Sequence, residues 1–220
     1  SWLGLAAIRD VVRHDMRALF VDWEDNATGM AERLVDLGLD DDEIARVDYR
    51  NPSGAISHGL ERFSGPYAVA VIDSTGEAMA AGGVDSNADQ EVAQWFATVK
   101  RVCRLDGGPA VIVIDHVPKD TEAPKSYAIG SQRKRAAVTG AAYRVDTLKE
   151  SAKGRDGLLK LTVAKDRHGN RPKGSVAAEV HMLSGRDGAL DIELRPSDAQ
   201  MAADRGEKFR PTVLMERVSH

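Results

Sequence analysis

The stretch YAVAVIDST, Tyr67–Thr75, decides the fold that the rest of the chain must follow. Its apolar run ends directly in Asp73, and the hydroxyls of Ser74 and Thr75 come next. An unbroken run of Val, Ile and Ala is typical of a parallel strand buried on both faces. Ligands bind beyond the carboxyl ends of such strands, and a carboxylate there needs a positive partner, often a metal ion. We therefore expect Asp73 to hold Mg²⁺ beside a nucleotide's phosphates, with Ser74 next to it. The alternative is a carboxylate that only caps a neighbouring loop.

Two more apolar runs end in the same way, ALFVDWED at Ala18–Asp25 and AVIVIDH at Ala110–His116. Carboxyl ends of neighbouring parallel strands share one edge of a sheet, so the three runs predict a single site. His116 is suited to sensing a γ-phosphate by hydrogen bonding, because both of its protonation states are accessible near pH 7. A lone His is more often structural, and only the acidic residues expected at the neighbouring strand ends favour a functional role for His116.

Three carboxylates crowd the end of the first run: Asp22, Glu24 and Asp25. A carboxylate near phosphate-bound Mg²⁺ can orient or deprotonate an attacking water molecule. Strand alternation sends Asp22 and Glu24 to the same side. We assign Asp25 to the N-cap of the next helix, for which Asn26 and Thr28 are the other candidates.

Length and composition indicate one globular domain with a substantial core. The chain has 220 residues, of which 42% are hydrophobic and 29% charged. It contains no apolar run of the roughly 18 residues that a membrane span needs, and its first residues do not resemble a signal peptide. The single cysteine, Cys103, excludes an internal disulfide and fits packing on a helix in a reducing cytoplasm.

The order of elements predicts a parallel α/β half followed by an antiparallel extension. Strands and helices alternate up to about residue 139, whereas short glycine-containing links join the later strands. Gly76–Asn87 reads as a loop over the strand ends. The expected helices are Trp2–Arg13, a helix from about Asn26 to Leu37, Gly54–Phe63, Asp89–Arg104 and a helix that begins at Gly130. The other expected strands are Ile44–Tyr49, Ala141–Leu148, Leu158–Ala164, Val176–Leu183 and Ala189–Leu194.

Cations are concentrated in one part of the chain. Pro118–Lys173 contains 14 Lys or Arg residues against 6 Asp or Glu, a local charge of +8 in a chain of net charge −4. Such a belt on an acidic body is a candidate surface for a polyanion, although a solvated face is equally compatible with the charge alone. The cations best placed for a phosphodiester backbone are Lys119, Lys125, Arg133, Lys134 and Arg135.

Lys165 and Arg167 stand where a strand runs into the turn DRHGNRPKG. Two cations at this spacing point to the same side of a strand end and can reach one phosphate together. Supplied by a neighbouring subunit, the pair would act as an arginine finger on a transferring phosphoryl group. The alternative is a solvated hairpin tip.

A family resemblance brings these motifs together. In chain order they are SWL (Ser1–Leu3), FVDWED (Phe20–Asp25), AVAVIDST (Ala68–Thr75), VIVIDHVPK (Val111–Lys119), YAIGSQRKRAAVTGAAYRV (Tyr127–Val145), LTVAKDRHGNRPKG (Leu161–Gly174) and RPTVLMERVSH (Arg210–His220). The sequence resembles the RecA-fold P-loop ATPases of hexameric replicative helicases, in particular RepA/DnaB-like domains. That resemblance implies ATP and Mg²⁺ as cofactors, a homo-oligomer that forms a hexameric ring, single-stranded DNA as partner, no membrane, and a cytoplasmic location.

The resemblance also implies roles for individual residues. Asp73 corresponds to the Walker B carboxylate that holds Mg²⁺, with Ser74 beside the nucleotide, and Ser1 to the last residue of Walker A, a ligand of Mg²⁺ and nucleotide. Glu24 corresponds to the catalytic base and His116 to the sensor, whereas Lys165 and Arg167 would enter the adjacent subunit's nucleotide site.

The glycine-rich cradle G-x-x-x-x-G-K-[ST] of these ATPases does not occur in the 220 residues. We therefore expect residues 1–195 to form a RecA-like core that lacks its N-terminal strand and most of Walker A. Residues 196–220 are expected to be a linker and the start of a winged-helix domain. Such a piece would lack most β- and γ-phosphate contacts, so hydrolysis is expected of its parent protein.

Two other functions fit parts of the pattern. One is a RecA-fold regulatory module that binds nucleotide and DNA without productive hydrolysis. The other is a doubly wound Mg²⁺ enzyme, phosphatase-like or receiver-like, that uses Asp22 and Asp73. The antiparallel second half argues against the latter, because those folds continue to alternate helices and strands.

Overall fold

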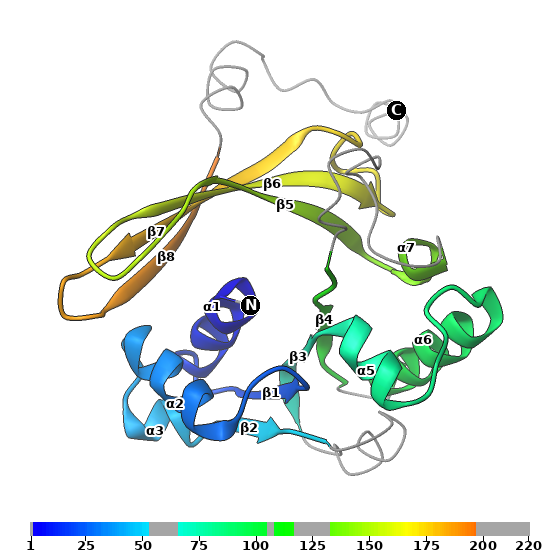
Figure 1. The fold of residues 1–220 in the computed structure, drawn as a ribbon, viewed down its shortest axis with the longest axis horizontal. Coiled ribbons are helices and arrows are strands. Elements are labelled where there is room, and N and C mark those ends of the chain that lie inside the picture. Colours follow the sequence, from blue (N-terminus) through cyan, green and yellow to red (C-terminus); the bar gives the residue numbers. More distant parts are fainter. Residues whose placement is uncertain (1, 53–65, 105–107, 117–132, 197–220) are drawn as a thin grey trace, which may run out of the picture.

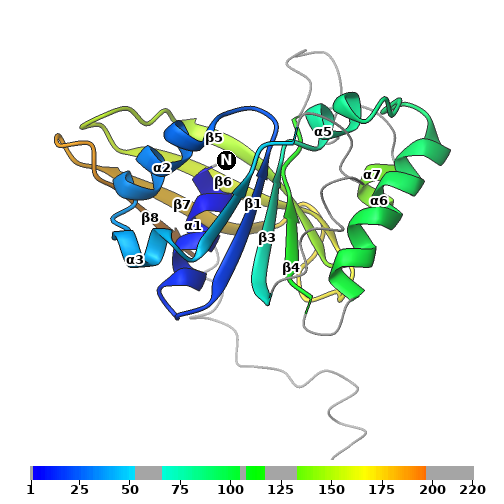
Figure 2. The same cartoon turned by 90° about the horizontal axis from the view of Figure 1, so that it is seen from below.

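The computed structural model describes residues 2–52, 66–104, 108–116 and 133–196. Within them the chain forms two four-stranded sheets with helices on both faces of the first (Figures 1 and 2). The predicted change from a parallel to an antiparallel half is confirmed. The predicted helix Gly54–Phe63 and residues 197–220 lie outside the described residues.

The first sheet is entirely parallel, with strand order β2-β1-β3-β4. Its central strand β3 is buried along nearly all of its length, as its unbroken apolar run predicts. Because β1 and β3 pair in register, Asp22 lies directly beside Asp73 at the carboxyl edge. The strands are β1 (Arg17–Asp22), β2 (Val47–Arg50), β3 (Tyr67–Asp73) and β4 (Ala110–Val113).

The second sheet is an antiparallel meander in sequence order. Its inner face carries buried apolar side chains, among them Val163, Val180 and Ile192. Tyr143 and Val145 of the edge strand β5 pair with Val163 and Leu161 but remain largely exposed themselves. The strands are β5 (Ala141–Lys149), β6 (Gly157–Asp166), β7 (Val176–Ser184) and β8 (Leu190–Arg195).

Helix α1, Trp2–Val12, packs between the two sheets, which is why it is apolar nearly all round. Leu5 and Ile8 are completely buried, in one cluster with side chains of β1, β3 and β6–β8. Gly4 permits the close approach of the helix to β3, since a Cβ there would lie 2.8 Å from a methyl of Val71. The helix therefore joins both sheets into one core.

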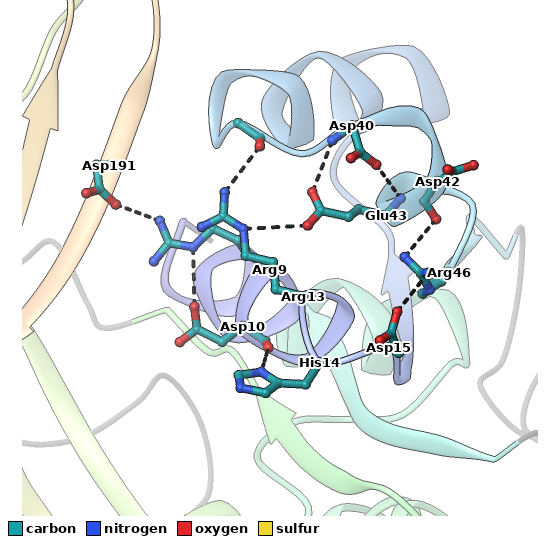
Figure 3. A network of polar contacts seen from close by, with 11 residues as sticks. Arg9, Asp10, Arg13, His14, Asp15, Asp40, Asp42, Glu43, Arg46 and Asp191 are labelled. Carbon is teal, nitrogen blue, oxygen red and sulfur yellow. Dashed lines mark hydrogen bonds and ion pairs between the residues drawn. The ribbon is translucent and has the colours of Figure 1, made fainter.

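Ion pairs at the end of α1 hold it to both neighbours (Figure 3). Arg9 is 8% exposed; it contacts Asp191 of β8 at 2.7 Å and donates to the carbonyl of Ile192 at 3.0 Å. On the other side Arg13 reaches Glu43, which belongs to the capping box of α3. These contacts fix α1 against β8 and against the α2–α3 hairpin.

α5 and α6 pack against the opposite face of the parallel sheet beside β3 and β4 (Figure 1). Val92, Trp95, Phe96 and Val99 of α6 are buried as predicted, whereas the side chain of Cys103 lies outside the described part. The remaining helices are α2 (Ala27–Asp36), α3 (Asp41–Ile44), α5 (Thr75–Ala81), α6 (Asp89–Arg104) and α7 (Arg133–Ala137).

Three local expectations were wrong. Gly76–Asn87 is not a simple loop, because α5 occupies its first part and buries Ala78 and Met79. The expected strand at Ile44–Tyr49 begins only at Val47, since α3 extends to Ile44. The N-cap of α2 is Asn26 rather than Asp25, whose carboxylate pairs with Arg33 at 2.7 Å.

No helix in the described ranges has the length and apolar character required to cross a membrane.

Candidate functional site

The carboxyl ends of β1, β3 and β4 lie side by side, so the expected meeting of the three acidic strand ends is confirmed. Asp73 ends the middle strand, while Glu24 and His116 follow the strands on either side. Glu24 and His116 contact each other across this edge, with 2.6 Å between Oε1 and Nε2. Segments 92 residues apart in sequence therefore form one site.

Glu24 is held as a carboxylate. Burial raises its pKa, but the hydrogen bond and the charge of His116, together with the nearby hydroxyl of Ser74, outweigh burial, so the net pKa is lowered. Its side chain remains 35% exposed, which leaves room for a water molecule or a substrate atom. A partly exposed, ionised carboxylate can accept a proton at neutral pH, as a general base must.

Asp73 and Ser74 form the floor of the site. They are 3% and 0% exposed, and Ser74 is the N-cap residue of α5. Thr75 donates through both its N–H (2.7 Å) and its hydroxyl (2.9 Å) to the carbonyl of Ile114, which ties the end of β3 to the end of β4. The floor is therefore rigidly connected to the segment that carries His116.

The chemistry of these residues fits Mg²⁺. Buried carboxylate and hydroxyl oxygens are its preferred protein ligands, and Mg²⁺ keeps several water molecules beside one or two carboxylates and substrate phosphates. The described residues contain no group of three His, Cys, Asp or Glu placed to hold a metal ion by themselves. Asp73, with Ser74 beside it, could contribute oxygen ligands to a Mg²⁺ ion that is also bound by a phosphate.

Lys134 faces the interior, contrary to its predicted role at a DNA surface. It is 5% exposed, and its Nζ lies 3.0 Å from Oδ2 and 3.2 Å from Oδ1 of Asp115. Burial raises the pKa of Asp115, and the charge of Lys134 lowers it in part. Since this ammonium is paired with Asp115 inside the fold, Lys134 is not available to contact the phosphates of DNA.

Lys165 and Arg167 do not act as a pair in this structure. The Nζ of Lys165 donates to the carbonyls of Arg135 (2.8 Å), Ala136 (3.0 Å) and Val138 (2.7 Å), so its three donors are used at the end of α7. Arg167 is exposed, and Asp166 between them accepts backbone N–H groups of the hairpin tip. Of the two cations, Arg167 is the one whose side chain is exposed.

A basic hollow of about 640 Å³ opens beside α7. Arg133, from α7, and Lys173, from the β6–β7 connection, are both exposed. Burial lowers the pKa of Lys165, and so do the charges of Arg167, Lys100 and Arg135, which shows how closely cations crowd here. The lining residues are Asp89, Arg133, Arg135, Ala136, Ala164, Lys165, Asp166 and Lys173.

Sequence patterns did not identify Tyr49 or Asn51 as part of the site. Both contact the Glu24-bearing segment from the neighbouring strand β2 and its C-terminal extension. No local motif marks them, and only the parallel pairing of β1 with β2 brings them there. The predicted site residues Ser1, Lys119 and Lys125 lie outside the described residues.

Comparison with solved structures identifies the fold as RecA-like. The crystal structure of the RadB recombinase matches with a TM-score of 0.57 at 19% sequence identity, over 89% of this chain and 87% of that chain. No family model matches the sequence, and no curated protein matches it. The expected fold class, a RecA-like α/β core with an antiparallel C-terminal extension, is thus confirmed.

Proposed function

We propose that this protein is the core of a Mg²⁺-ATP-dependent DNA motor of the helicase type, which couples hydrolysis to the binding and translocation of single-stranded DNA. The observation that carries the proposal is the Glu24–His116 pair beside buried Asp73, at the carboxyl edge of a RecA-like sheet. This edge is where α/β folds bind nucleotides.

Each residue of the proposed site would have its own role in hydrolysis. Asp73, with Ser74 beside it, would hold Mg²⁺, which neutralises charge on the transferring phosphoryl group when it is bound. Glu24 would accept the proton of the attacking water, because its lowered pKa keeps it ionised. His116, hydrogen-bonded to Glu24, would orient this carboxylate and respond to the γ-phosphate.

Assembly into a ring would complete each site. Arg167 is exposed at the end of β6 and is the remaining candidate for a finger that reaches the neighbouring subunit's nucleotide. Arginine suits this role because its planar guanidinium binds phosphate oxygens bidentately. A ring of six members and a role for Ser1 as a Walker A residue are parts of the same proposal.

The basic hollow would bind the phosphodiester backbone of single-stranded DNA. Arg133, Arg135 and Lys173 line it, and the sequence places Lys119 and Lys125 in the segment that leads into α7. Cations from α7 and the β6–β7 connection suit backbone contacts, which position a strand without reading its sequence.

Removal of the Asp73 carboxylate should abolish Mg²⁺ binding. We expect Mn²⁺, used with ATP as a paramagnetic substitute, to broaden the amide NMR signals of Ser74, Glu24 and His116. Asp73→Asn should remove that broadening, since an amide is a much weaker ligand for a hard cation. Asp48→Asn, at the opposite end of the sheet, is the control. Equal broadening in the wild type and the Asp73→Asn variant would show that the metal site lies elsewhere.

Neutralising the basic hollow should weaken DNA binding and its salt dependence. For Arg133→Ala/Lys173→Ala we expect the affinity for a labelled single-stranded oligonucleotide to fall about tenfold, and the slope of log K against log [salt] to decrease by about 1.4, as about 0.7 per lost contact implies. Fluorescence anisotropy measures both. Lys149→Ala/Lys153→Ala removes the same charge elsewhere; an equal loss in that variant would assign binding to net charge rather than to the hollow.

A further inference from the structure

The segment that carries Glu24 is folded around one buried side chain, Asp22. Asp22 is 3% exposed, and its Oδ1 accepts the backbone N–H groups of Glu24 (2.8 Å) and Asp25 (3.2 Å). The N–H of Trp23 donates to the carbonyl of Asp73 at 2.8 Å. Three consecutive backbone amides after β1 are thereby fixed, and Glu24 is the side chain that this turn presents to His116.

A second strand holds the same turn from the other side. The hydroxyl of Tyr49 lies 3.2 Å from Oδ2 of Asp22 and 3.1 Å from the carbonyl of Asp25. Asn51 donates to that carbonyl at 2.6 Å, and the Tyr49 ring stacks on Phe20, with 6.4 Å between ring centroids. The turn is therefore clamped between β1 and β2 through its carboxylate and through its backbone.

Asp22 is the register partner of Asp73 at the carboxyl edge of the sheet, and its two oxygens are engaged within the protein. Both oxygens of Asp22 face donors of the protein, two N–H groups on Oδ1 and a hydroxyl on Oδ2. Burial, together with the charges of Asp22 and Asp25, raises the pKa of Tyr49 to about 12, so the hydroxyl keeps its proton and remains a donor at neutral pH. A carboxylate occupied in this way is suited to fixing backbone rather than to binding a cation.

We propose that Asp22 and Tyr49 are positioning residues, which hold the Glu24 carboxylate against His116 and over the Asp73 floor. The catalytic consequence rests on the proposed function, because it requires Glu24 to act as a base. The geometric claim, that Asp22 and Tyr49 order the Glu24 turn, is independent of any activity. A displacement of about 1 Å can cost about 100-fold in rate, so such a clamp matters for a general base.

The test combines amide hydrogen exchange on this chain with kinetics on the same variants of the parent protein that we expect to carry Walker A. Asp22→Ala should accelerate exchange of the Glu24 and Asp25 amides at least about tenfold, because their acceptor is removed. It should also lower kcat of Mg²⁺-dependent ATP hydrolysis about 10- to 100-fold, with KM changed by less than about threefold. Asp22→Asn keeps an oxygen acceptor and should recover the protection and most of kcat. Tyr49→Phe, which loses only the hydroxyl, should lie between the two.

Tyr67→Phe is the matched control, since the Tyr67 hydroxyl bonds to Asp48 at the far end of the sheet. It should leave the exchange of the Glu24 and Asp25 amides unchanged.

Unaltered exchange in both Asp22→Ala and Tyr49→Phe would overturn the proposal. A kcat in Asp22→Asn as low as in Asp22→Ala, with amide protection kept, would also overturn it, because the charge itself would then be required. Absence of hydrolysis in the wild-type parent protein that we expect to carry Walker A would refute the proposed function alone, and hydrogen exchange would still decide the positioning role. If Asp22→Ala does not fold, Asp22→Asn and Tyr49→Phe carry the test.

Discussion

In the parent protein that we expect to carry Walker A, Glu24→Gln should reduce Mg²⁺-dependent ATP hydrolysis by at least about 100-fold, while ATP affinity changes less than about threefold. The amide keeps nearly the shape of the carboxylate and can still contact His116, but it cannot accept a proton from water. Loss of a general base appears in the transition state, so kcat falls and binding is retained. Steady-state kinetics and isothermal titration with ATP measure the two quantities.

Glu32→Gln is a matched control, because Glu32 is an exposed carboxylate on α2, the helix that follows the Glu24 turn. We expect wild-type rates from it. The lowered pKa of Glu24 adds a pH test. The carboxylate stays ionised at pH values below the ordinary glutamate pKa, so the fall of kcat at acidic pH should occur below that pKa. His116→Ala removes a hydrogen bond that lowers this pKa and should move this fall to higher pH. Full activity of Glu24→Gln would mean that another group serves as the base.

Lys134→Met should destabilise the fold by about 3 kcal/mol at pH 7, the largest stability effect expected here. The substitution conserves volume but leaves the Asp115 carboxylate, 18% exposed, without its cation. The expected readout is a lower midpoint in urea with an unchanged m-value. Lys149→Met, at an exposed position, should change the free energy of unfolding by less than about 0.5 kcal/mol.

The pH dependence of this loss has a definite sign. Because burial raises the pKa of Asp115, the folded state binds the proton more tightly than the unfolded state does. The stability that protonation contributes is present below the ordinary aspartate pKa and is lost as the pH rises through the raised value. Lys134 lowers this pKa in part, so Lys134→Met gains more stability from protonation of Asp115 than the wild type does. The difference in the free energy of unfolding between Lys134→Met and the wild type should therefore narrow at acidic pH. Asp115→Asn/Lys134→Met should recover much of the loss at pH 7; failure to recover it would show that Lys134 stabilises α7 by packing rather than by its charge.

Much of the fold could be predicted because its signals are local. The apolar runs before Asp22, Asp73 and Asp115 identify parallel strands, since a strand covered on both faces must be apolar at every position. The structure buries β1 and β3 almost throughout, whereas β4 at the edge of the sheet is only partly buried. Helix α1 was expected to be buried because it is apolar all round. Helix α5 was missed because Thr75–Ala81 includes a glycine and is short, so the packing of Met79 and Ala78 under α6 stabilises it more than local propensity does.

The candidate site was predicted less completely. The sequence placed Glu24, Asp73 and His116 at strand ends, and parallel pairing brings such ends together. The sequence could not show which cations face outward, because a lysine that is buried in the fold looks the same in the sequence as one that is exposed. Lys134 is directed inward by the partly buried carboxylate of Asp115, and Lys165 is held by the carbonyls at the end of a short helix. Both arrangements exist only in the folded chain.

The sequence by itself determined the two halves, the strand ends that carry acids and the excess of cations in one region. These follow from hydrophobic periodicity and local charge, which depend on neighbours in the chain. Only the tertiary structure decided that Glu24 meets His116, that Tyr49 clamps the turn through Asp22, and that Lys134 is buried. These contacts join residues far apart in sequence, so they depend on strand order and register, which local patterns do not encode.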